Sequence, residues 1–440
     1  MEAANQPITA PHERFSTRYR VYVLLLLTIG YLLNFVDRQV MTILLEPIKN
    51  EFGATDTQMG FLSGLAFALF YATLGIPVAR LADRWSRRNV LSISMATWSA
   101  VTSLCAFAAG FWQMAVLRVG VGVGEAGGTP PSQSLLADYF PPDSRSLAQG
   151  VLATAPNIGI LVGLFGGALI AEAFGWRSVF IAFGLPGILL ALIVFFTVRE
   201  PDKIERPPST SDRSLWQAVK SIVAIPAFPF IALAVGFTAI SGYGFGVWAP
   251  SFLIRVHEVE LVDAGLYLGL IGAVGGGLGT IMGGYLSDRL AARHLRCQLM
   301  LPVLGILLAL PLQIAFLVWP EGRFIEISGK QVPEALIFMA ASSIFAGFWI
   351  GPTYAAVQNL VPQYWRTQAS ALLLLAFNLL GMGLGPLLVG TLSDILEGYG
   401  DASIRYALLA SLSTVVVGAF LYWRGSYRYA RALSMKTSIQ

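Results

Sequence analysis

Four charged residues lie inside long apolar stretches of this 440-residue chain. Asp37 and Arg38 stand in the middle of the apolar run 20–45, and Arg118 and Glu125 lie within the run 112–137. A charge at the centre of a lipid bilayer costs about 2.5–3.5 kcal/mol on insertion scales, so charges are rarely found there without a role. Carboxylates can carry protons and guanidiniums can bind anions, so these residues indicate a pathway for an ion or a substrate.

Helical geometry restricts how these four residues can pair. Asp37 and Arg38 are neighbours, so their side chains leave a helix about 100° apart and each needs a partner elsewhere. Arg118 and Glu125 are seven residues apart, which places them on one face and about 10.5 Å apart along the axis. The sequence leaves open which arginine pairs with which carboxylate. We expect Asp37 and Glu125 to couple protons, and Arg38 and Arg118 to bind an anionic headgroup.

The alternative is a static network of ion pairs that holds the two helices together. Buried ion pairs do not reliably stabilise a fold, because the cost of desolvation can exceed the Coulomb attraction. A role in coupling or binding is therefore the favoured interpretation.

The composition places these residues in a membrane protein. Hydrophobic residues make up 55% of the chain and charged residues 12%, against about 25% charged residues in a typical soluble domain. The runs are long and continuously apolar, which excludes the alternating pattern of a β-barrel. The sequence predicts an all-α membrane protein with twelve transmembrane helices, at 20–45, 59–81, 89–110, 112–137, 146–171, 176–198, 227–254, 264–287, 298–318, 334–360, 367–392 and 403–424.

The distribution of lysine and arginine predicts the orientation. Positive charge gathers in the N-terminal and C-terminal tails and in the connections after the second, sixth and eighth helices, so both termini should be cytoplasmic. No clustered basic domain indicates nucleic-acid binding. Short connections and the lack of an appended domain predict a multi-pass protein of a bacterial inner membrane, and we expect a monomer in the bilayer.

The sequence gives no sign of a cofactor, a metal site or an enzyme. His12, His257 and His294 are scattered, and Cys105 and Cys297 are far apart in the sequence. No nucleophile with a neighbouring base and no phosphate-binding loop is present. A channel or a lipid receptor remains as a rival interpretation of the buried charges, and a saturable, gradient-dependent flux would distinguish a carrier from both.

The two halves of the chain repeat each other. LADRWSRR at 81–88 is matched by LSDRLAAR at 286–293, and Pro141, Arg145 and Asn157 recur as Pro362, Arg366 and Asn378. Repeated units around a central site are common in transporters. The predicted domains are an N-terminal six-helix bundle at 1–198, a cytoplasmic linker at 199–225, and a C-terminal six-helix bundle at 226–440.

These motifs resemble the major facilitator superfamily over essentially the whole chain. The segment 81–88 is similar to its signature G-x-L-A-D-R-x-G-R-K, although Ala79 and Ser86 replace two glycines. The resemblance implies two six-helix bundles, alternating access and a loop that latches the cytoplasmic side. The implied gate residues are Asp83, Arg84, Arg87, Arg88, Asp288 and Arg289.

Within that superfamily the chain resembles the Spinster-like branch. YLLNFVDRQV at 31–40 is similar to the N-Y-x-D-R motif of the branch, with Phe35 in place of tyrosine, and 118–126 is similar to R-x-x-x-G-x-G-E-A. The resemblance implies transport of lysophospholipids or sphingosine-phosphate-like lipids. Organic-anion transporters carry similar motifs, so a symporter for carboxylates or sugar acids is the alternative.

Further polar residues at membrane depth are candidates for substrate contact, or for hydrogen bonds between helices. Glycine stripes in the fourth and fifth helices are assigned to close helix packing rather than to the ligand. The C-terminal half carries no comparable charge inside its helices, so its wall of the cavity should be apolar, with Phe245, Trp248, Phe345, Phe348 and Trp349 available. The polar candidates are Tyr31, Asn34, Asn157, Tyr243, Tyr354 and Asn378.

Overall fold

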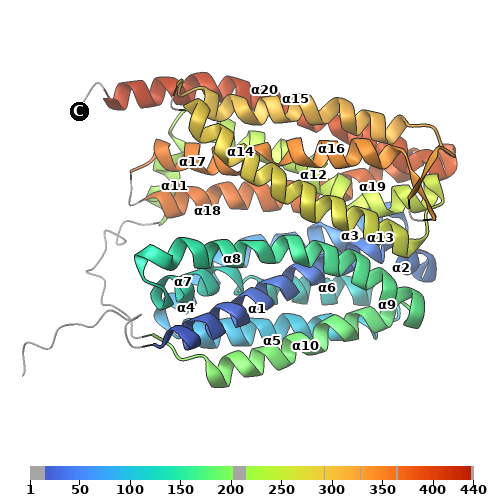
Figure 1. The fold of residues 1–440 in the computed structure, drawn as a ribbon, viewed down its shortest axis with the longest axis horizontal. Coiled ribbons are helices and arrows are strands. Elements are labelled where there is room, and N and C mark those ends of the chain that lie inside the picture. The colour runs from blue at the N-terminus through green and yellow to red at the C-terminus, as the bar shows by residue number, and fades with distance from the viewer. Residues whose placement is uncertain (1–14, 202–214, 292, 328, 363–364, 438–440) are drawn as a thin grey trace, which may run out of the picture.

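The computed structural model describes residues 15–201, 215–291, 293–327, 329–362 and 365–437. Helices from the first half of the chain lie beside helices from the second half, as the blue-to-green and yellow-to-red ribbons in Figure 1 show. We call them the N-terminal group and the C-terminal group. The linker end of the molecule is the end where α10 finishes and α11 begins, and the hairpin end is the opposite one, which carries the two strands.

The first half of the chain forms the N-terminal group. Its helices are α1 (Thr17–Ile43), α2 (Leu45–Phe52), α3 (Asp56–Ser63), α4 (Leu65–Arg84), α5 (Arg87–Cys105), α6 (Phe111–Glu125), α7 (Thr129–Tyr139), α8 (Pro142–Leu161), η2 (Val162–Gly166), α9 (Gly167–Phe174) and α10 (Trp176–Thr197).

The second half forms the C-terminal group and the hairpin. Its elements are α11 (Leu215–Val223), α12 (Phe228–His257), α13 (Leu261–Leu270), η4 (Ile271–Gly275), α14 (Gly276–Ala291), α15 (Cys297–Val318), β1 (Phe324–Ile327), β2 (Lys330–Pro333), α16 (Ala335–Ala346), η5 (Gly347–Trp349), α17 (Ile350–Leu360), α18 (Arg366–Ala376), η7 (Phe377–Leu384), α19 (Gly385–Ile395), η8 (Glu397–Ala402) and α20 (Ser403–Thr437).

Long apolar runs form the helices, and local signals set their ends. The Thr55 hydroxyl and the Gln58 side chain make a capping box that starts α3. Glu258 adopts a left-handed conformation, with φ of 53°, where α12 ends. All twelve predicted segments are largely helical, but within the described residues ten helices are long and apolar enough to cross a membrane. The predicted helix 112–137 is interrupted by a turn between α6 and α7.

Neither the β-hairpin nor the short helix α11 was predicted from the sequence. Strands β1 and β2 pair antiparallel, from Phe324 opposite Pro333 to Ile327 opposite Lys330. The Lys330 ammonium binds the Asp263 carboxylate at the start of α13, which ties the hairpin to the C-terminal group. The short helix α11 lies inside the range predicted as a linker, of which residues 202–214 are outside the described part of the chain.

Helices that face the opposite group are irregular near mid-length. The predicted helices 146–171, 264–287 and 367–392 each contain a π-helical stretch, namely η2, η4 and η7. The predicted helix 59–81 breaks at Gly64, which has φ of −111° and ψ of −92° and separates α3 from α4. Insertions of this kind often accompany functional sites and local bending.

Glycines let the two groups touch through their backbones toward the hairpin end. A Cβ on Gly60 of α3 would lie 2.4 Å from the Pro386 carbonyl oxygen of α19. A Cβ on Gly265 of α13 would lie 2.6 Å from the Leu164 carbonyl oxygen of η2. Any larger residue at either position must therefore push the groups apart.

The Gly60→Ala variant tests this seam. The added methyl group meets backbone, so we expect destabilisation by about 1–3 kcal/mol, which opposes the gain in helix propensity. Thermal unfolding in one fixed detergent measures the effect. Gly150→Ala is the matched control, because Gly150 is exposed on α8 and a Cβ there would meet no atom within 4 Å. Equal unfolding midpoints for the two variants would contradict close backbone contact at the seam.

Candidate functional site

The four buried charges form one cluster inside the N-terminal group. Helix α1 carries Asp37 and Arg38, and α6 carries Arg118 and Glu125. The Arg38 guanidinium donates through Nε to Glu125 Oε2 at 2.9 Å, and its Nη2 lies 2.9 Å from the same oxygen. The sequence left open which arginine pairs with which carboxylate. In the structure Arg38 binds Glu125, and Arg118 lies beside Asp37.

The second pair is looser than the first. Arg118 Nη1 is 3.8 Å from Asp37 Oδ2, beyond hydrogen-bonding distance, while the Thr102 hydroxyl donates to Asp37 Oδ1 at 2.8 Å. Asp37, Arg118 and Glu125 are at most 3% exposed. Within the described part of the chain, Asp37 Oδ2, Glu125 Oε1 and two nitrogens of Arg118 have no hydrogen-bond partner. Buried polar atoms normally have partners, so this cluster retains capacity for another polar group.

Aromatic rings cover both guanidiniums. The Phe67 ring of α4 lies 5.2 Å from the Arg38 guanidinium carbon and 5.3 Å from that of Arg118, so one ring contacts both cations. Tyr71 lies 4.5 Å and Phe35 5.1 Å from Arg38. Cations over ring faces are attracted by the ring quadrupole, more strongly where water is excluded.

Sequence reasoning missed Phe67, Tyr71 and Thr102. Phe67 and Tyr71 are four residues apart in an apolar run, so they stack on one helical face, with ring centroids 5.4 Å apart. Nothing in that run distinguishes them from ordinary core residues. Thr102 carries no charge and lies on α5, a different helix from Asp37, to which it donates its hydrogen bond.

Two of the predicted polar residues, Asn34 and Tyr31, lie beside Arg38 on α1. Asn34 is buried one turn before Arg38 and accepts a hydrogen bond from its Nη2 at 3.2 Å. Tyr31 packs edge-on against Phe35, with ring centroids 5.2 Å apart. From the C-terminal group, Tyr243 packs against the same buried apolar cluster as Tyr31 and Tyr71. Tyr354 packs against the larger hydrophobic core.

The two predicted asparagines lie elsewhere. Asn157 Nδ2 is 3.5 Å from where a Cβ on Gly277 would stand, so Asn157 packs against α14 of the opposite group. Asn378 is buried within η7. The structure does not bring them into the cluster around Arg38.

The predicted aromatic wall is divided between core and cavity. Phe245, Trp248 and Phe348 are buried core residues, and the Trp248 indole donates to the Pro386 carbonyl at 2.9 Å. Phe345 and Trp349 line a cavity. The predicted glycine stripe of α6 is confirmed as a packing face, since a Cβ on Gly122 would lie 2.5 Å from the Phe67 carbonyl oxygen.

The predicted gate residues of the first half make contacts inside their own group. The Arg87 guanidinium binds the Asp138 carboxylate of α7 and donates to Glu200 at 2.9 Å. Glu200 also accepts from the Ser86 hydroxyl at 2.9 Å and from the Arg88 backbone N–H at 2.8 Å, so it caps the start of α5.

Of the other predicted gate residues, Arg88 is half-buried, and its guanidinium donates to the Val198 carbonyl at 3.3 Å. Arg84, Asp288 and Arg289 are exposed, and the Arg289 guanidinium lies 4.8 Å from the Tyr285 ring centroid. The side chain of Asp83 is outside the described part of the structure.

A charge cluster at the hairpin end joins the two groups and was not predicted. Arg255, in the last turn of α12, donates to both carboxylate oxygens of Asp56, at 2.7 and 2.8 Å, and to Glu46 at 2.9 Å. Lys49 also binds Asp56, at 2.6 Å.

The N-terminus of α3 is bound from the opposite group as well. Asp394 of α19 accepts from the backbone N–H groups of Asp56 at 3.0 Å and Thr57 at 2.8 Å. The Ser393 hydroxyl donates to Asp56 at 2.7 Å. A carboxylate at a helix N-terminus satisfies free N–H groups and favours the helix dipole, so this contact holds α3 against α19.

Comparisons with known proteins agree with this architecture. The family model of the Major Facilitator Superfamily matches residues 27–386, and the chain belongs to that superfamily of transporters. A crystal structure of a bacterial homologue of the human lysosomal transporter Spinster, inward-facing and unoccupied, is 30% identical, with a TM-score of 0.82 over 95% of this chain and 99% of that one. Within the superfamily the chain is Spinster-like, as its motifs predicted.

Two curated relatives are also similar to this chain. An MFS-type efflux pump of Mycolicibacterium smegmatis is 34% identical over 405 residues, which cover 91% of each chain. A probable galactarate/D-glucarate transporter of Bacillus subtilis is 26% identical over 309 residues, covering 64% of this chain and 67% of the relative.

The contacts of Glu200 predict how stability depends on pH. Burial opposes ionisation of Glu200, but the Arg88 N–H, the Arg87 guanidinium and the Ser86 hydroxyl outweigh it, so the pKa of Glu200 is lowered. A lowered pKa in the folded state contributes stability above the unfolded value of about 4.3, and this stability is lost as the pH falls through the folded value. We expect Glu200→Gln to cost about 1–3 kcal/mol at neutral pH and less at pH 3–4.

Thermal unfolding of the wild type and Glu200→Gln between pH 3 and pH 8 measures this difference. Glu326→Gln, at an exposed position in β1, is the control and should leave the profile unchanged. A constant difference between wild type and Glu200→Gln across the range would rule out a contribution from the ionised carboxylate.

Proposed function

We propose that this protein is a proton-coupled secondary transporter that moves an anionic, amphipathic substrate by alternating access. The observation that carries the proposal is the buried cluster of two carboxylates and two guanidiniums, whose hydrogen-bonding capacity is only partly used. Such a cluster is costly to bury and gives the chain a way to link the binding of a proton to the binding of a substrate anion.

The proposed coupling runs through the tighter pair. Protonation of Glu125 removes the negative partner of Arg38 and leaves that guanidinium, which is the most exposed of the four groups at 15%, free to bind an anionic headgroup. Loss of the proton restores the Arg38–Glu125 pair and disfavours the substrate. Asp37 acts on Arg118 in the same way. The two carboxylates interact electrostatically, so their proton affinities are linked.

The proposed substrate is a lysophospholipid or a sphingosine-phosphate-like lipid. Support comes from the Spinster-like family and from the charge difference between the groups, since the cluster lies in the N-terminal group and apolar side chains line a cavity in the C-terminal group. Tyr31, Asn34, Tyr243 and Tyr354 would contact the headgroup. Asn157 and Asn378 are proposed as contacts in other states of the cycle, because both lie on helices that face the opposite group.

The alternative is a symporter for organic anions such as carboxylates or sugar acids. The relative with galactarate/D-glucarate transport in its name favours this alternative. A small dianion would use the two guanidiniums but would leave the apolar cavity unused.

The proposed topology follows from the charge bias of the sequence. It comprises twelve spans in two domains, 1–198 and 226–440, joined by the linker 199–225, with both termini in the cytoplasm of a bacterium and the chain in its inner membrane as a monomer. The hairpin end would then face away from the cytoplasm. Asp83, Arg84, Arg87, Arg88, Asp288 and Arg289 would form the gate at the linker end.

Uptake driven by a pH gradient into proteoliposomes tests the coupling. We expect Glu125→Gln and Asp37→Asn to lower gradient-driven flux at least about tenfold while substrate exchange without a gradient is retained, because a neutral side chain can no longer carry the proton. Glu51→Gln is the control, since Glu51 is an exposed carboxylate at the hairpin end, paired with Arg177. Full gradient-driven flux in both cluster variants would refute the proposal.

Thermal shift with two ligand classes tests the substrate. A specific ligand at one hundred times its Kd stabilises the state that it binds by about 2.7 kcal/mol. We expect stabilisation by a lysophospholipid, little effect of D-glucarate, and loss of the shift in Arg38→Gln. Stabilisation by D-glucarate without a response to lysophospholipid would favour the organic-anion alternative.

A further inference from the structure

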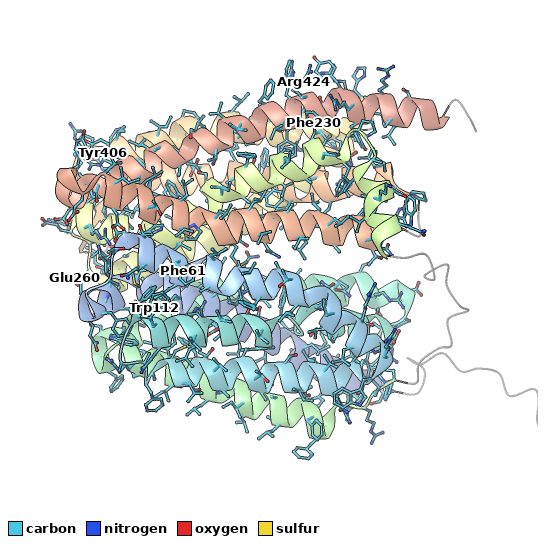
Figure 2. The ribbon with its side chains drawn as sticks, turned by 180° about the vertical axis from the view of Figure 1, so that it is seen from behind. Phe61, Trp112, Phe230, Glu260, Tyr406 and Arg424 are labelled. Carbon is cyan, nitrogen blue, oxygen red and sulfur yellow. The ribbon has the colours of Figure 1, made fainter. Side chains whose placement is uncertain are left out.

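The exposed face of α20 changes from aromatic to cationic near its C-terminal end. Phe420, Trp423 and Tyr427 are spaced three to four residues apart, so their rings follow one helical face, and all three are exposed. Arg424 and Arg431 continue this face toward the linker end and are exposed as well. Figure 2 shows Arg424 at the edge of the C-terminal group that is farthest from the N-terminal group.

Two further guanidiniums flank this face, and each lies over an aromatic ring. Arg296, directly before α15, is 3.6 Å from the Tyr427 ring centroid, and its Nε has no hydrogen-bond partner among the described residues. Arg428 of α20 is 4.0 Å from the ring centroid of Phe230 in α12. A ring attracts the guanidinium and orients it without neutralising its charge, so both cations stay available to an anion.

No carboxylate of the neighbouring helices balances this charge. The sequences of α12, α15 and α20 contain neither aspartate nor glutamate. Within the described part of the chain, the ion pairs involve none of the four arginines of this region. We call these four residues the outer arginine cluster: Arg296, Arg424, Arg428 and Arg431. Guanidiniums match the geometry of phosphate oxygens, so a phosphate is a suitable partner.

The apolar part of the same face suits the chains of a lipid. Val416 and Val417 are exposed and precede Phe420 on α20. A helix rises 1.5 Å per residue, so this apolar stretch extends about 12 Å from Val416 to Arg424. Aromatic residues gather at the membrane interface, and basic sites beside transmembrane helices bind anionic lipid headgroups. A ligand with a phosphate and acyl chains would therefore match both parts of the face.

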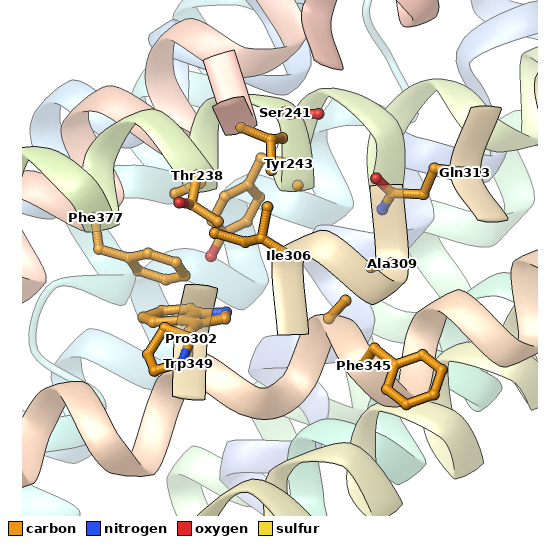
Figure 3. Close-up of a pocket in the computed structure, with 14 residues that line it drawn as sticks. Thr238, Ser241, Tyr243, Pro302, Ile306, Ala309, Gln313, Phe345, Trp349 and Phe377 are labelled. Atoms are coloured by element: carbon orange, nitrogen blue, oxygen red, sulfur yellow. The ribbon is translucent and has the colours of Figure 1, made fainter. Parts of the chain in front are cut away.

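We propose that the outer arginine cluster binds the headgroup of an anionic diacyl phospholipid, whose chains lie along Phe420 and Trp423. This lipid is a bound partner of the transporter rather than its cargo, so the proposal goes beyond the proposed function. The cavity in Figure 3 is a separate feature, since none of the four arginines lines it. The buried charges are separate as well, because they lie in the N-terminal group.

Native mass spectrometry of the delipidated full-length protein tests the proposal. Dioleoyl phosphatidylglycerol and dioleoyl phosphatidylcholine carry the same chains, so competition between them isolates the effect of the headgroup. We expect the wild type to retain one phosphatidylglycerol in preference. An arginine near an anionic lipid contributes about fivefold in affinity, so Arg424→Gln/Arg431→Gln should lower this preference at least about tenfold.

The matched control removes the same charge from the other helix group. Arg18→Gln/Arg145→Gln replaces two exposed arginines at the starts of α1 and α8, also at the linker end, and should keep the wild-type preference. Arg424 and Arg431 are exposed, so without lipid their variant should unfold at the wild-type temperature. Arg296→Gln provides a second variant, on α15 rather than α20, and should lower the preference about fivefold.

Three outcomes would overturn the proposal. Equal retention of the two lipids by the wild type, or an equal loss in the cluster and control variants, would mean that the arginines act only by general attraction to a charged surface. Displacement of phosphatidylglycerol by an equal concentration of glycerol 3-phosphate would mean that the chains contribute nothing. Loss of phosphatidylglycerol in Arg38→Gln would assign the lipid to the buried charges instead, which contradicts this site and leaves the proposed transport function intact.

Discussion

The arrangement of this molecule depends on the cost of holding four charges away from water. Asp37, Arg38, Arg118 and Glu125 are tolerable in the interior only because each carboxylate has a guanidinium beside it, and removal of one partner from a buried pair typically costs 3–5 kcal/mol. The pairs are unequal, since Arg38 binds Glu125 at 2.9 Å whereas Arg118 stands 3.8 Å from Asp37. Phe67 lies against both guanidiniums, so the two cations share one aromatic ring.

Glycines bring the two helix groups into close backbone contact, as Gly122 does within the N-terminal group. At Gly60 and Gly265 backbone meets backbone, and the π-helical stretches η2, η4 and η7 lie in helices that face the opposite group. A seam of this kind has few interlocking side chains that must be withdrawn when two rigid bodies rotate. At the hairpin end, Arg255 binds Asp56, and Asp394 accepts hydrogen bonds from the N-terminus of α3. These directional polar contacts fix how the two groups are aligned, which glycine contacts alone do not. Figure 2 shows the same two groups from behind, with Phe61 and Glu260 labelled near this end.

The sequence was sufficient to predict the helical segments and to single out the four charges, because both follow from the incompatibility of charge with an apolar run. The sequence could not predict which arginine pairs with which carboxylate. Adjacent residues on α1 point in different directions, and the rotation of α6 about its axis is set by packing. Phe67 and Tyr71 could not be singled out, because an aromatic residue beside a guanidinium and one in the core have the same local sequence. Arg255 lies at a helix end, where a basic residue suggests only topology, and its partners Glu46 and Asp56 are about two hundred residues away in the chain.

The carboxylate of Asp394 at the start of α3 has a consequence for how the hairpin end responds to its surroundings. It satisfies two backbone N–H groups, and the neighbouring Asp56 carboxylate is almost completely enclosed with Arg255. At 0.1 M salt the Debye length is about 10 Å, which weakens exposed pairs such as Glu51–Arg177 but acts little on enclosed ones. The contact between the two helix groups at the hairpin end should therefore hold in dilute and in saline media alike.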